Sequence, residues 1–354
     1  MLQFSSRFLS VQQGTYLVFS LCVLLFLSAC APSPPKKVVL RGETMGTTYS
    51  ISYFPTSSDM GNEATSEVVH EQIKQRLLEV NQVASTYIPD SELSTFNQSE
   101  GTTPVVLSPD LNVLIQESIN LAKLTDGALD VTVGPLVNLW GFGPDKTPNK
   151  TPTAEQVEDA RLRSGIEKLH LEEGRLSKTT PALYVDLSTI AKGFGVDEVA
   201  AVLEQNNIQN YLVEIGGEIR VKGVKAKAEP WRIAIEKPVS EAQTVQRILQ
   251  PGTNGVATSG DYRNFFERDG KRYSHIINPT TGEPINHRLV SVTVLHPSCM
   301  LADGLSTSFM VLGQEKAMAL ANQEGIAALF IEKLPNGQFK ETFSDAMQSY
   351  INRQ

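Results

Sequence analysis

One segment of this 354-residue chain carries polar side chains at a spacing that suits phosphate chemistry. Asp186, Thr189 and Lys192 recur at intervals of three, and a helix is predicted to begin near Gly193. A carboxylate, a hydroxyl and an ammonium group would then lie together at a helix N-terminus, where backbone N–H groups bind anions. The segment therefore predicts a site for a phosphorylated ligand.

A second segment offers oxygen ligands for a metal ion. Asp303 and Thr307 are four residues apart, so a helix would project both from one face, with Ser306 beside them. A carboxylate with hydroxyl and carbonyl oxygens is a hard-oxygen set, which Mg²⁺ prefers; that ion recruits few protein groups and completes its shell with water and phosphate oxygens. Together the two segments predict a Mg²⁺-dependent site.

Helices and strands that would position these groups alternate along the chain. Apolar residues at helical spacing predict a helix over residues 66–85. A second helix is predicted from the cap Ser108 to Gly127, and a capping box from Thr153 to Gln156 predicts a third. Strand-like runs follow this order: Arg41–Tyr53, Ala182–Leu187, Tyr211–Val221, Trp231–Glu236, Ser291–Leu295 and Ile326–Ile331. Several runs are interrupted by Gly or polar turns, with Gly216 and Gly217 read as a hairpin turn, so a mixed or antiparallel sheet is expected.

The N-terminus is typical of a bacterial lipoprotein. Arg7 precedes an apolar run over residues 16–27, and Leu27-Ser28-Ala29-Cys30 matches the site where Cys30 is lipidated and becomes the new N-terminus. A Pro-rich tether follows, and Ala31 favours the outer over the inner membrane, so we expect a periplasmic, lipid-anchored protein. The expected organisation is a signal peptide over 1–29, a lipidated Cys and tether over 30–39, and one domain over 40–354.

Composition and absent motifs exclude several classes of protein. The net charge is −8, which argues against nucleic acid as a partner. Cys299 is the single thiol expected in the mature, unlipidated part of the chain, so no intramolecular disulfide is predicted. G-x-G-x-x-G, P-loop, H-E-x-x-H and G-x-S-x-G sequences are missing, which argues against a Rossmann or P-loop enzyme.

Five further polar clusters flanked by glycine or proline accompany the two segments above. They are Glu43–Tyr49, Thr125–Pro135, Ile215–Arg220, Thr258–Arg263 and His275–Pro279. In this order, and over residues 41–331, the clusters resemble those of the ApbE-type flavin transferases. Enzymes of this family attach FMN from FAD to a Thr or Ser of a partner protein through a phosphoester bond.

The resemblance implies a fold and a set of site residues. The fold would be α+β, with helices packed on mixed, largely antiparallel sheets in a tandem, T-fold-like body. The residues implied to contact FAD are Met45, Tyr87, Ala128, Leu129, Asp130, Asp186, Lys192, His275 and Ile276. Those implied to bind Mg²⁺ are Thr189, Asp303 and Thr307, with Ser306 an adjacent candidate. Whether Thr189 would bind through its side chain or its carbonyl stays open.

Transfer of FMN needs a base for the acceptor hydroxyl. His275 is the first candidate, because imidazole titrates near neutral pH, and Asp261 is the second. Two other functions stay open: a Mg²⁺-dependent FAD pyrophosphatase that yields FMN and AMP, and a flavin-binding lipoprotein without chemistry. The resemblance points to acceptor subunits of membrane electron-transport complexes, of the sodium-pumping quinone reductase or Rnf type.

Overall fold

The computed structural model describes residues 36–55, 63–99, 102–143, 151–239, 244–261, 265–268 and 271–351. The predicted signal peptide, Cys30 and most of the predicted tether lie outside these ranges. Among the described helices, none combines the length and apolar character needed to span a membrane.

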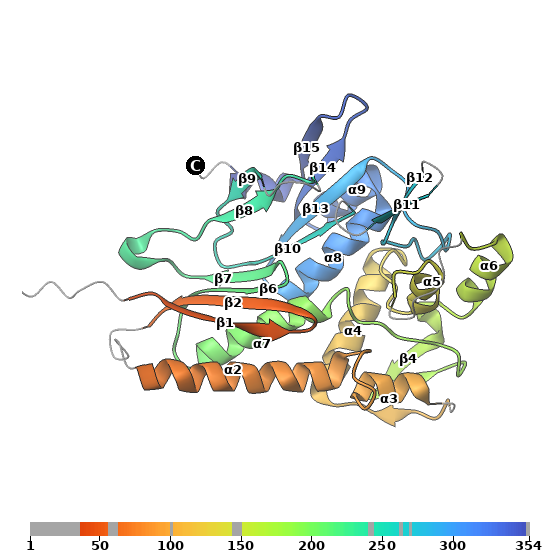
Figure 1. Cartoon of the computed structure of the whole chain (residues 1–354), viewed down its shortest axis with the longest axis horizontal. Coiled ribbons are helices and arrows are strands. Elements are labelled where there is room, and N and C mark those ends of the chain that lie inside the picture. Colours follow the sequence, from red (N-terminus) through yellow and green to blue (C-terminus); the bar gives the residue numbers. More distant parts are fainter. Residues whose placement is uncertain are drawn as a thin grey trace, which may run out of the picture. The chain divides into compact units, whose positions relative to one another are not determined.

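An eight-stranded sheet runs through the described part of the chain (Figure 1). Its strands pair in the order β1-β2-β6-β7-β10-β13-β14-β15, and every neighbouring pair is antiparallel. The bounds are β1 (Val38–Thr44), β2 (Thr47–Phe54), β6 (Asn210–Ile215), β7 (Glu218–Lys222), β10 (Gly255–Gly260), β13 (Leu289–His296), β14 (Ala327–Lys333) and β15 (Phe339–Phe343). The expected α+β fold with a largely antiparallel sheet is confirmed.

Helices and three small sheets surround this sheet. The helices are α2 (Glu63–Ala84), α3 (Glu92–Gln98), α4 (Pro109–Leu124), α5 (Gly134–Leu139), α6 (Ala154–Leu162), α7 (Ala191–Gln205), α8 (Cys299–Leu312), α9 (Gln314–Gln323) and α10 (Gln348–Ile351). The small sheets comprise β3 (Val105–Val106), β5 (Arg175–Lys178) and β4 (Leu169–Glu172); β8 (Ile233–Glu236) and β9 (Val245–Leu249); and β11 (Phe265–Arg268) and β12 (Lys271–Ser274).

The predicted helix ends are present because each depends on local hydrogen bonds. The Ser108 hydroxyl accepts from the N–H of Leu111 at the start of α4. Thr153 and Gln156 bond each other's backbone N–H groups, which completes the capping box of α6. Beyond α4, the N–H of Gly127 donates to the carbonyl of Ala122 at 2.8 Å and closes the helix end.

The strand predictions were confirmed in part. The runs 41–53 and 211–221 each form a hairpin, broken by the two-residue turns Met45–Gly46 and Gly216–Gly217. The predicted strand Ala182–Leu187 was wrong, because its backbone bonds to a side chain instead of a neighbouring strand. The Asn97 amide accepts from the N–H of Val185 and donates to the carbonyl of the same residue, both at 2.8 Å.

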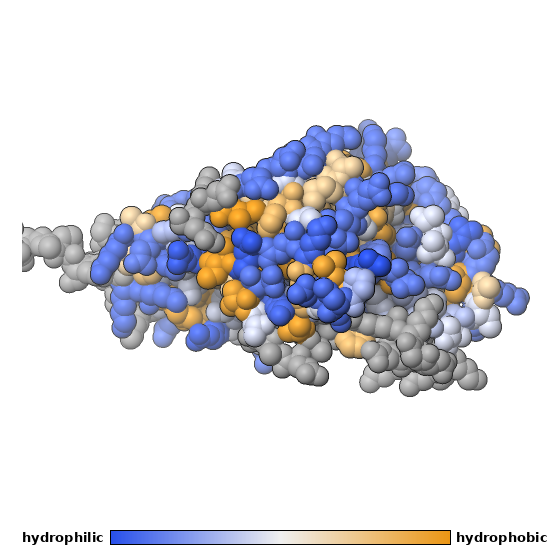
Figure 2. Space-filling model, turned by 90° about the horizontal axis from the view of Figure 1, so that it is seen from above, coloured by the Kyte–Doolittle hydropathy of each residue, from blue (hydrophilic) through white to orange (hydrophobic). Residues whose placement is uncertain are grey.

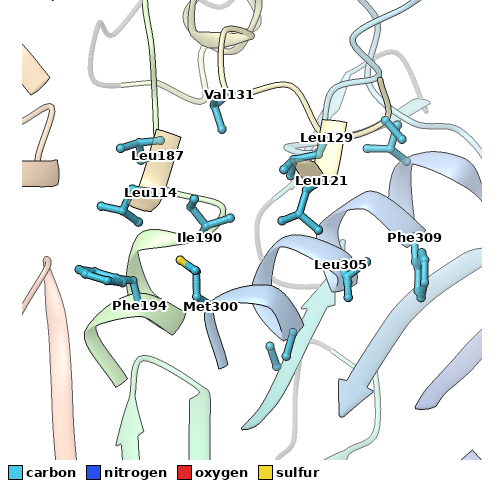
Figure 3. Close-up of a cluster of buried hydrophobic side chains, with 14 of the residues drawn as sticks. Leu114, Leu121, Leu129, Val131, Leu187, Ile190, Phe194, Met300, Leu305 and Phe309 are labelled. Carbon is cyan, nitrogen blue, oxygen red and sulfur yellow. The ribbon is translucent and has the colours of Figure 1, made fainter. Parts of the chain in front are cut away.

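Both faces of the sheet are buried, and alternate residues face opposite cores. On β14, Ala328 and Phe330 face the core that contains α4, α7 and α8, whereas Leu329 and Ile331 face the core under β8 and β9. Figure 3 shows side chains of α4, α7 and α8 meeting in the first of these cores, among them Leu121, Phe194 and Leu305. A third core joins α2 and α7 to the β1–β2 hairpin. In Figure 2, hydrophilic residues cover most of one face of the molecule and hydrophobic ones form small patches.

The start of α8 is fixed by a carboxylate from α7. The two Asp197 oxygens accept from the N–H groups of Cys299 and Met300 at 3.0 and 3.1 Å and from the Ser298 hydroxyl at 2.8 Å. Arg220 of β7 donates to the same carboxylate at 2.5 Å. Asp197 therefore ties α7, α8 and the sheet together, and it does so with a negative charge at a helix N-terminus.

Gly193 lets the two helices approach closely at this junction. A Cβ atom at Gly193 would lie 2.4 Å from the carbonyl oxygen of Cys299, which is far inside contact distance. The first turn of α7 therefore lies directly on the first turn of α8.

Replacing Asp197 with Asn is expected to lower the free energy of unfolding by roughly 1.5–3 kcal/mol, the usual cost of losing hydrogen bonds to a charged group. The amide has one acceptor oxygen, and its NH₂ group would face N–H donors. Urea unfolding followed by circular dichroism measures the change. Asp159→Asn, which alters a 69% exposed carboxylate on α6, is the matched control and should leave stability nearly unchanged. Equal losses in the two variants would contradict the role of Asp197.

Candidate functional site

A buried carboxylate on α8 meets the N-terminus of α7. Asp303 is 3% exposed, and its Oδ2 atom accepts from the backbone N–H of Gly193 at 3.1 Å. Burial raises the pKa of the Asp303 carboxyl above its ordinary value, and the nearby ammonium of Lys192 opposes that shift. The contact joins the two segments whose spacing predicted chemistry.

Lys192, in the first turn of α7, lies between two carboxylates. Its Nζ atom is 2.7 Å from Oε1 of Glu218 on β7 and 3.9 Å from Oδ1 of Asp303. Burial alone would lower the pKa of Lys192, but the two carboxylates outweigh burial and raise it. Lys192 is therefore a cation in the folded protein, where it can bind an anionic ligand.

Three hydroxyl groups form a chain beside Asp303. A carbonyl only accepts, so Ser306 donates to the carbonyl oxygen of Asp303 at 2.9 Å. Ser259 of β10 must then donate to Ser306 at 2.8 Å and accept from Thr307 at 2.9 Å, because each hydroxyl has one proton. Neither of the other two hydroxyls donates to the Thr307 oxygen, so its lone pairs are available for a cation.

Thr189 lies just before α7 with an unsatisfied oxygen. Its Oγ1 atom is buried and has no hydrogen-bond partner among the described residues. Buried polar atoms are rarely left without a partner, so this hydroxyl is suited to a ligand that the protein binds. The side chain is thus a metal-ligand candidate alongside the Thr189 carbonyl.

Two hairpin turns lie over the first turns of α7. A Cβ atom at Gly195 would lie 2.7 Å from the Met45 Cε atom, so the Met45 side chain rests on the helix backbone. A Cβ atom at Gly216 would meet the Thr47 side chain at 2.8 Å and the Lys192 Cδ atom at 3.5 Å. The turns of β1–β2 and β6–β7 therefore gather Met45 and Lys192 at one end of α7.

The predicted FAD contacts after α4 form a loop with its own hydrogen bonds. Ala128 and Leu129 are buried. Asp130 accepts from the N–H and hydroxyl of Thr132 at 2.7 and 2.6 Å and from the N–H of Ile166 at 3.1 Å. Burial raises the pKa of the Asp130 carboxyl, and these hydrogen bonds counter the shift. Asp130 therefore supports the loop, and its contact with FAD stays a prediction.

The remaining predicted residues are distributed over several elements. Asp186 accepts from the N–H of Ser188 at 2.8 Å, whereas the Tyr87 side chain is 76% exposed after α2. His275 lies edge-on to Phe142 with ring centroids 6.3 Å apart, and Ile276 beside it is buried.

Asp261, the second candidate base, is 9% exposed at the end of β10. Its N–H donates to the carbonyl of Val290 at 3.2 Å, so the residue is held next to the sheet. The roles of His275 and Asp261 as candidate bases stay predictions.

Sequence reasoning singled out neither Glu218 nor Ser259. Both belong to clusters that were recognised, at 215–220 and 258–263, but their partners lie on α7 and α8, far away in sequence. The available sequence signal for Glu218 was an acidic residue directly after the Gly216–Gly217 turn. A cavity of about 350 Å³ opens elsewhere, between α6 and residues 281–286, and none of the predicted site residues lines it.

Known proteins are similar in sequence to this chain along nearly its whole length. The sequence model of the ApbE family matches residues 45–330. A Vibrio cholerae protein named FAD:protein FMN transferase is 52% identical, over 94% of this chain and 98% of its own length. The Escherichia coli K12 protein of the same name is 40% identical, over 94% of this chain and 96% of its own length.

Solved structures agree with the fold. The flavin transferase ApbE from Vibrio cholerae has a TM-score of 0.83 at 52% identity, and the match covers 90% of this chain and all of that one. The flavinyl transferase ApbE from Pseudomonas stutzeri, without ligand, also scores 0.83, at 39% identity over 91% of this chain and 99% of that one. By sequence and by structure, this chain belongs to the ApbE family.

Proposed function

We propose that this chain transfers FMN from FAD to a Thr or Ser hydroxyl of an acceptor protein and releases AMP in a Mg²⁺-dependent reaction. Relatives at 52% and 40% identity carry the name FAD:protein FMN transferase. The observation that carries the proposal is the contact between the first turn of α7 and Asp303. It brings an ammonium, a helix N-terminus and a buried carboxylate together, as a pyrophosphate with a divalent cation requires.

The oxygens around Asp303 fit Mg²⁺. Asp303 uses Oδ2 for the N–H of Gly193, while the ion-pair partner of Oδ1 among the described residues is Lys192, at 3.9 Å. The unsatisfied Thr189 hydroxyl and the Thr307 lone pairs add neutral oxygens. No group of three His, Cys, Asp or Glu side chains in the described ranges could hold a metal, but Mg²⁺ commonly binds through one or two carboxylates plus water and phosphate. Bound there, Mg²⁺ would neutralise negative charge that develops on the phosphate oxygens.

The proposed step forms one bond and breaks another. The acceptor hydroxyl oxygen attacks the phosphorus on the FMN side of the pyrophosphate. The bond from that phosphorus to the bridging oxygen breaks, and its electron pair leaves with AMP. Lys192 binds a pyrophosphate oxygen and stabilises its charge, while the hydroxyl proton passes to His275 or, as the second candidate, to Asp261.

We further propose that Cys30 anchors the domain to the periplasmic face of a membrane, with the outer membrane favoured by Ala31. The acceptor would be a subunit of a membrane electron-transport complex. The support is the complete lipoprotein signal and the Pro-rich segment that separates Cys30 from β1.

Asp303→Asn tests the metal site and the reaction together. The parent chain, incubated with FAD, Mg²⁺ and a candidate acceptor, is expected to yield an FMN-modified acceptor and equimolar AMP. The variant should be slower by about 10²–10³, since it loses an electrostatic contact to the transition state. Mass spectrometry of the acceptor and chromatography of the nucleotides give both products.

Asp159→Asn, which alters an exposed carboxylate on α6, is the control and should react at the parent rate. Free FMN plus AMP without a modified acceptor would identify a pyrophosphatase, and unchanged FAD a flavin carrier. A parent-like rate for Asp303→Asn, or undiminished activity after exhaustive chelation, would refute the metal assignment.

His275→Asn separates a base from a structural residue. If His275 accepts the proton, the variant binds FAD normally and transfers FMN about 10²–10⁴ times more slowly. The parent rate should fall in acid, because a protonated imidazole cannot accept a proton, and the variant should lack that fall. Stopped reactions across a pH series measure both, with exposed His170→Asn as control. A variant that transfers FMN at the parent rate would move the role to Asp261.

Cys30→Ser tests the anchor. The variant is expected to accumulate as an unprocessed precursor, because no thiol is available for diacylation. Labelling cells with a palmitate analogue would show the missing lipid, and the mass of the protein would show the uncleaved signal peptide. Cys22→Ser, inside the predicted signal, should mature normally; normal processing of Cys30→Ser would disprove lipidation at this position.

A further inference from the structure

We propose that Glu218 is a positioning residue: it holds the Lys192 ammonium away from Asp303 and so keeps the Asp303 carboxylate open for Mg²⁺. This inference rests on the proposed metal site and adds a residue that the resemblance did not supply.

The distances assign Lys192 to Glu218. Its Nζ atom is 2.7 Å from Glu218 Oε1, a normal charge-assisted hydrogen bond. The 3.9 Å between Nζ and Asp303 Oδ1 is too long for a hydrogen bond. Asp303 instead hydrogen-bonds the N–H of Gly193 through its other oxygen, so its Oδ1 atom stays available.

Lys192 is the reason that Glu218 can be buried. The Glu218 side chain is 5% exposed, and its second oxygen, Oε2, has no hydrogen-bond partner in the described parts of the chain. Burial of an unpaired carboxylate is strongly unfavourable, so the ion pair with Lys192 is what compensates it. Among the described residues, no other cation is paired with Glu218.

The β6–β7 hairpin places Glu218 where it can hold the ammonium. Glu218 is the first residue of β7, and it pairs with Ile215 across the Gly216–Gly217 turn. The N–H of Gly217 donates to the Glu214 carboxylate at 2.8 Å, which braces that turn. The same turn lies on the Lys192 stem, 3.5 Å from Cδ to a Cβ built at Gly216. The hairpin therefore places Glu218 within hydrogen-bond distance of the ammonium, while Asp303 lies 3.9 Å from it.

Loss of Glu218 would release Lys192 to the remaining carboxylate. An ammonium in contact with Asp303 would occupy its oxygen lone pairs and repel a divalent cation. Lys192 would then compete with Mg²⁺ for Asp303. With Glu218 present, the ammonium stays close enough to bind a phosphate without blocking the carboxylate.

A double-mutant cycle tests the proposal by calorimetric titration of the full chain with Mg²⁺ alone. Glu218→Gln is expected to weaken Mg²⁺ binding roughly tenfold, because the interaction energy between neighbouring charged residues is commonly large enough to change an affinity by about that factor. Adding Lys192→Met to that variant should restore most of the affinity. In the parent background, where Glu218 already holds the ammonium aside, Lys192→Met should change the affinity by a smaller factor than in the Glu218→Gln background; it also leaves Glu218 unpaired, so its unfolding temperature should fall.

The size of the Lys192→Met effect in the two backgrounds decides the outcome. Equal effects would mean that the charges act independently, and would overturn the positioning role while leaving the proposed metal site intact. Absence of Mg²⁺ binding by the parent chain would overturn both. Glu214→Gln removes one negative charge from the same hairpin, while its amide oxygen can still accept from the Gly217 N–H, so it should leave the affinity within about threefold.

Thermal unfolding of each variant guards against loss of the fold. If Glu218→Gln does not fold, Glu218→Asp keeps the charge but withdraws it from the ammonium, and should weaken Mg²⁺ binding. Lys192→Met should rescue that variant as well. A weakened variant that Lys192→Met does not rescue would count against the proposal.

Discussion

The structure depends on the reciprocal contact between the N-terminal halves of α7 and α8. Asp197 of α7 receives backbone N–H groups at the start of α8, and Asp303 of α8 receives a backbone N–H at the start of α7. Each helix thereby supplies a negative charge to the positive end of the other. Gly193 permits the close approach, because a side chain there would collide with the backbone of Cys299.

This junction explains why the site forms where the hairpins meet the helices. The turns of β1–β2 and β6–β7 both lie on α7, and they bring Met45 and Glu218 to its N-terminal end. β10 brings Ser259 to the hydroxyls of Ser306 and Thr307 on α8. Polar residues from distant segments can share one site because the surrounding apolar core fixes the helices that carry them (Figure 3).

Buried charges elsewhere in the domain serve a different purpose. Lys178 is 1% exposed and donates to the carbonyls of Phe96, Asn97 and Pro181 at 3.0–3.3 Å, while its ammonium lies over the Phe96 ring. Burial lowers the pKa of Lys178. The donors of Lys178 are satisfied by carbonyls of α3 and of Pro181, and the acceptors of Asp130 by neighbouring N–H groups, so both residues brace backbone. Around Lys192, by contrast, oxygens of Thr189 and Glu218 lack partners among the described residues, as expected where a ligand binds.

The amino-acid sequence by itself determined the features that depend on neighbours along the chain. Ser108, the Thr153–Gln156 box and the glycine-containing turns were readable because caps and turns need only residues a few positions apart. The order of the polar clusters was sufficient to recognise the family.

Tertiary structure decided which of those groups meet. The pairing of Lys192 with Glu218, the pinning of Val185 by Asn97 and the hydroxyl chain through Ser259 each join residues 26 or more positions apart. No local spacing encodes such contacts, because they exist only after the sheet and the helices have packed and brought those side chains within hydrogen-bond distance.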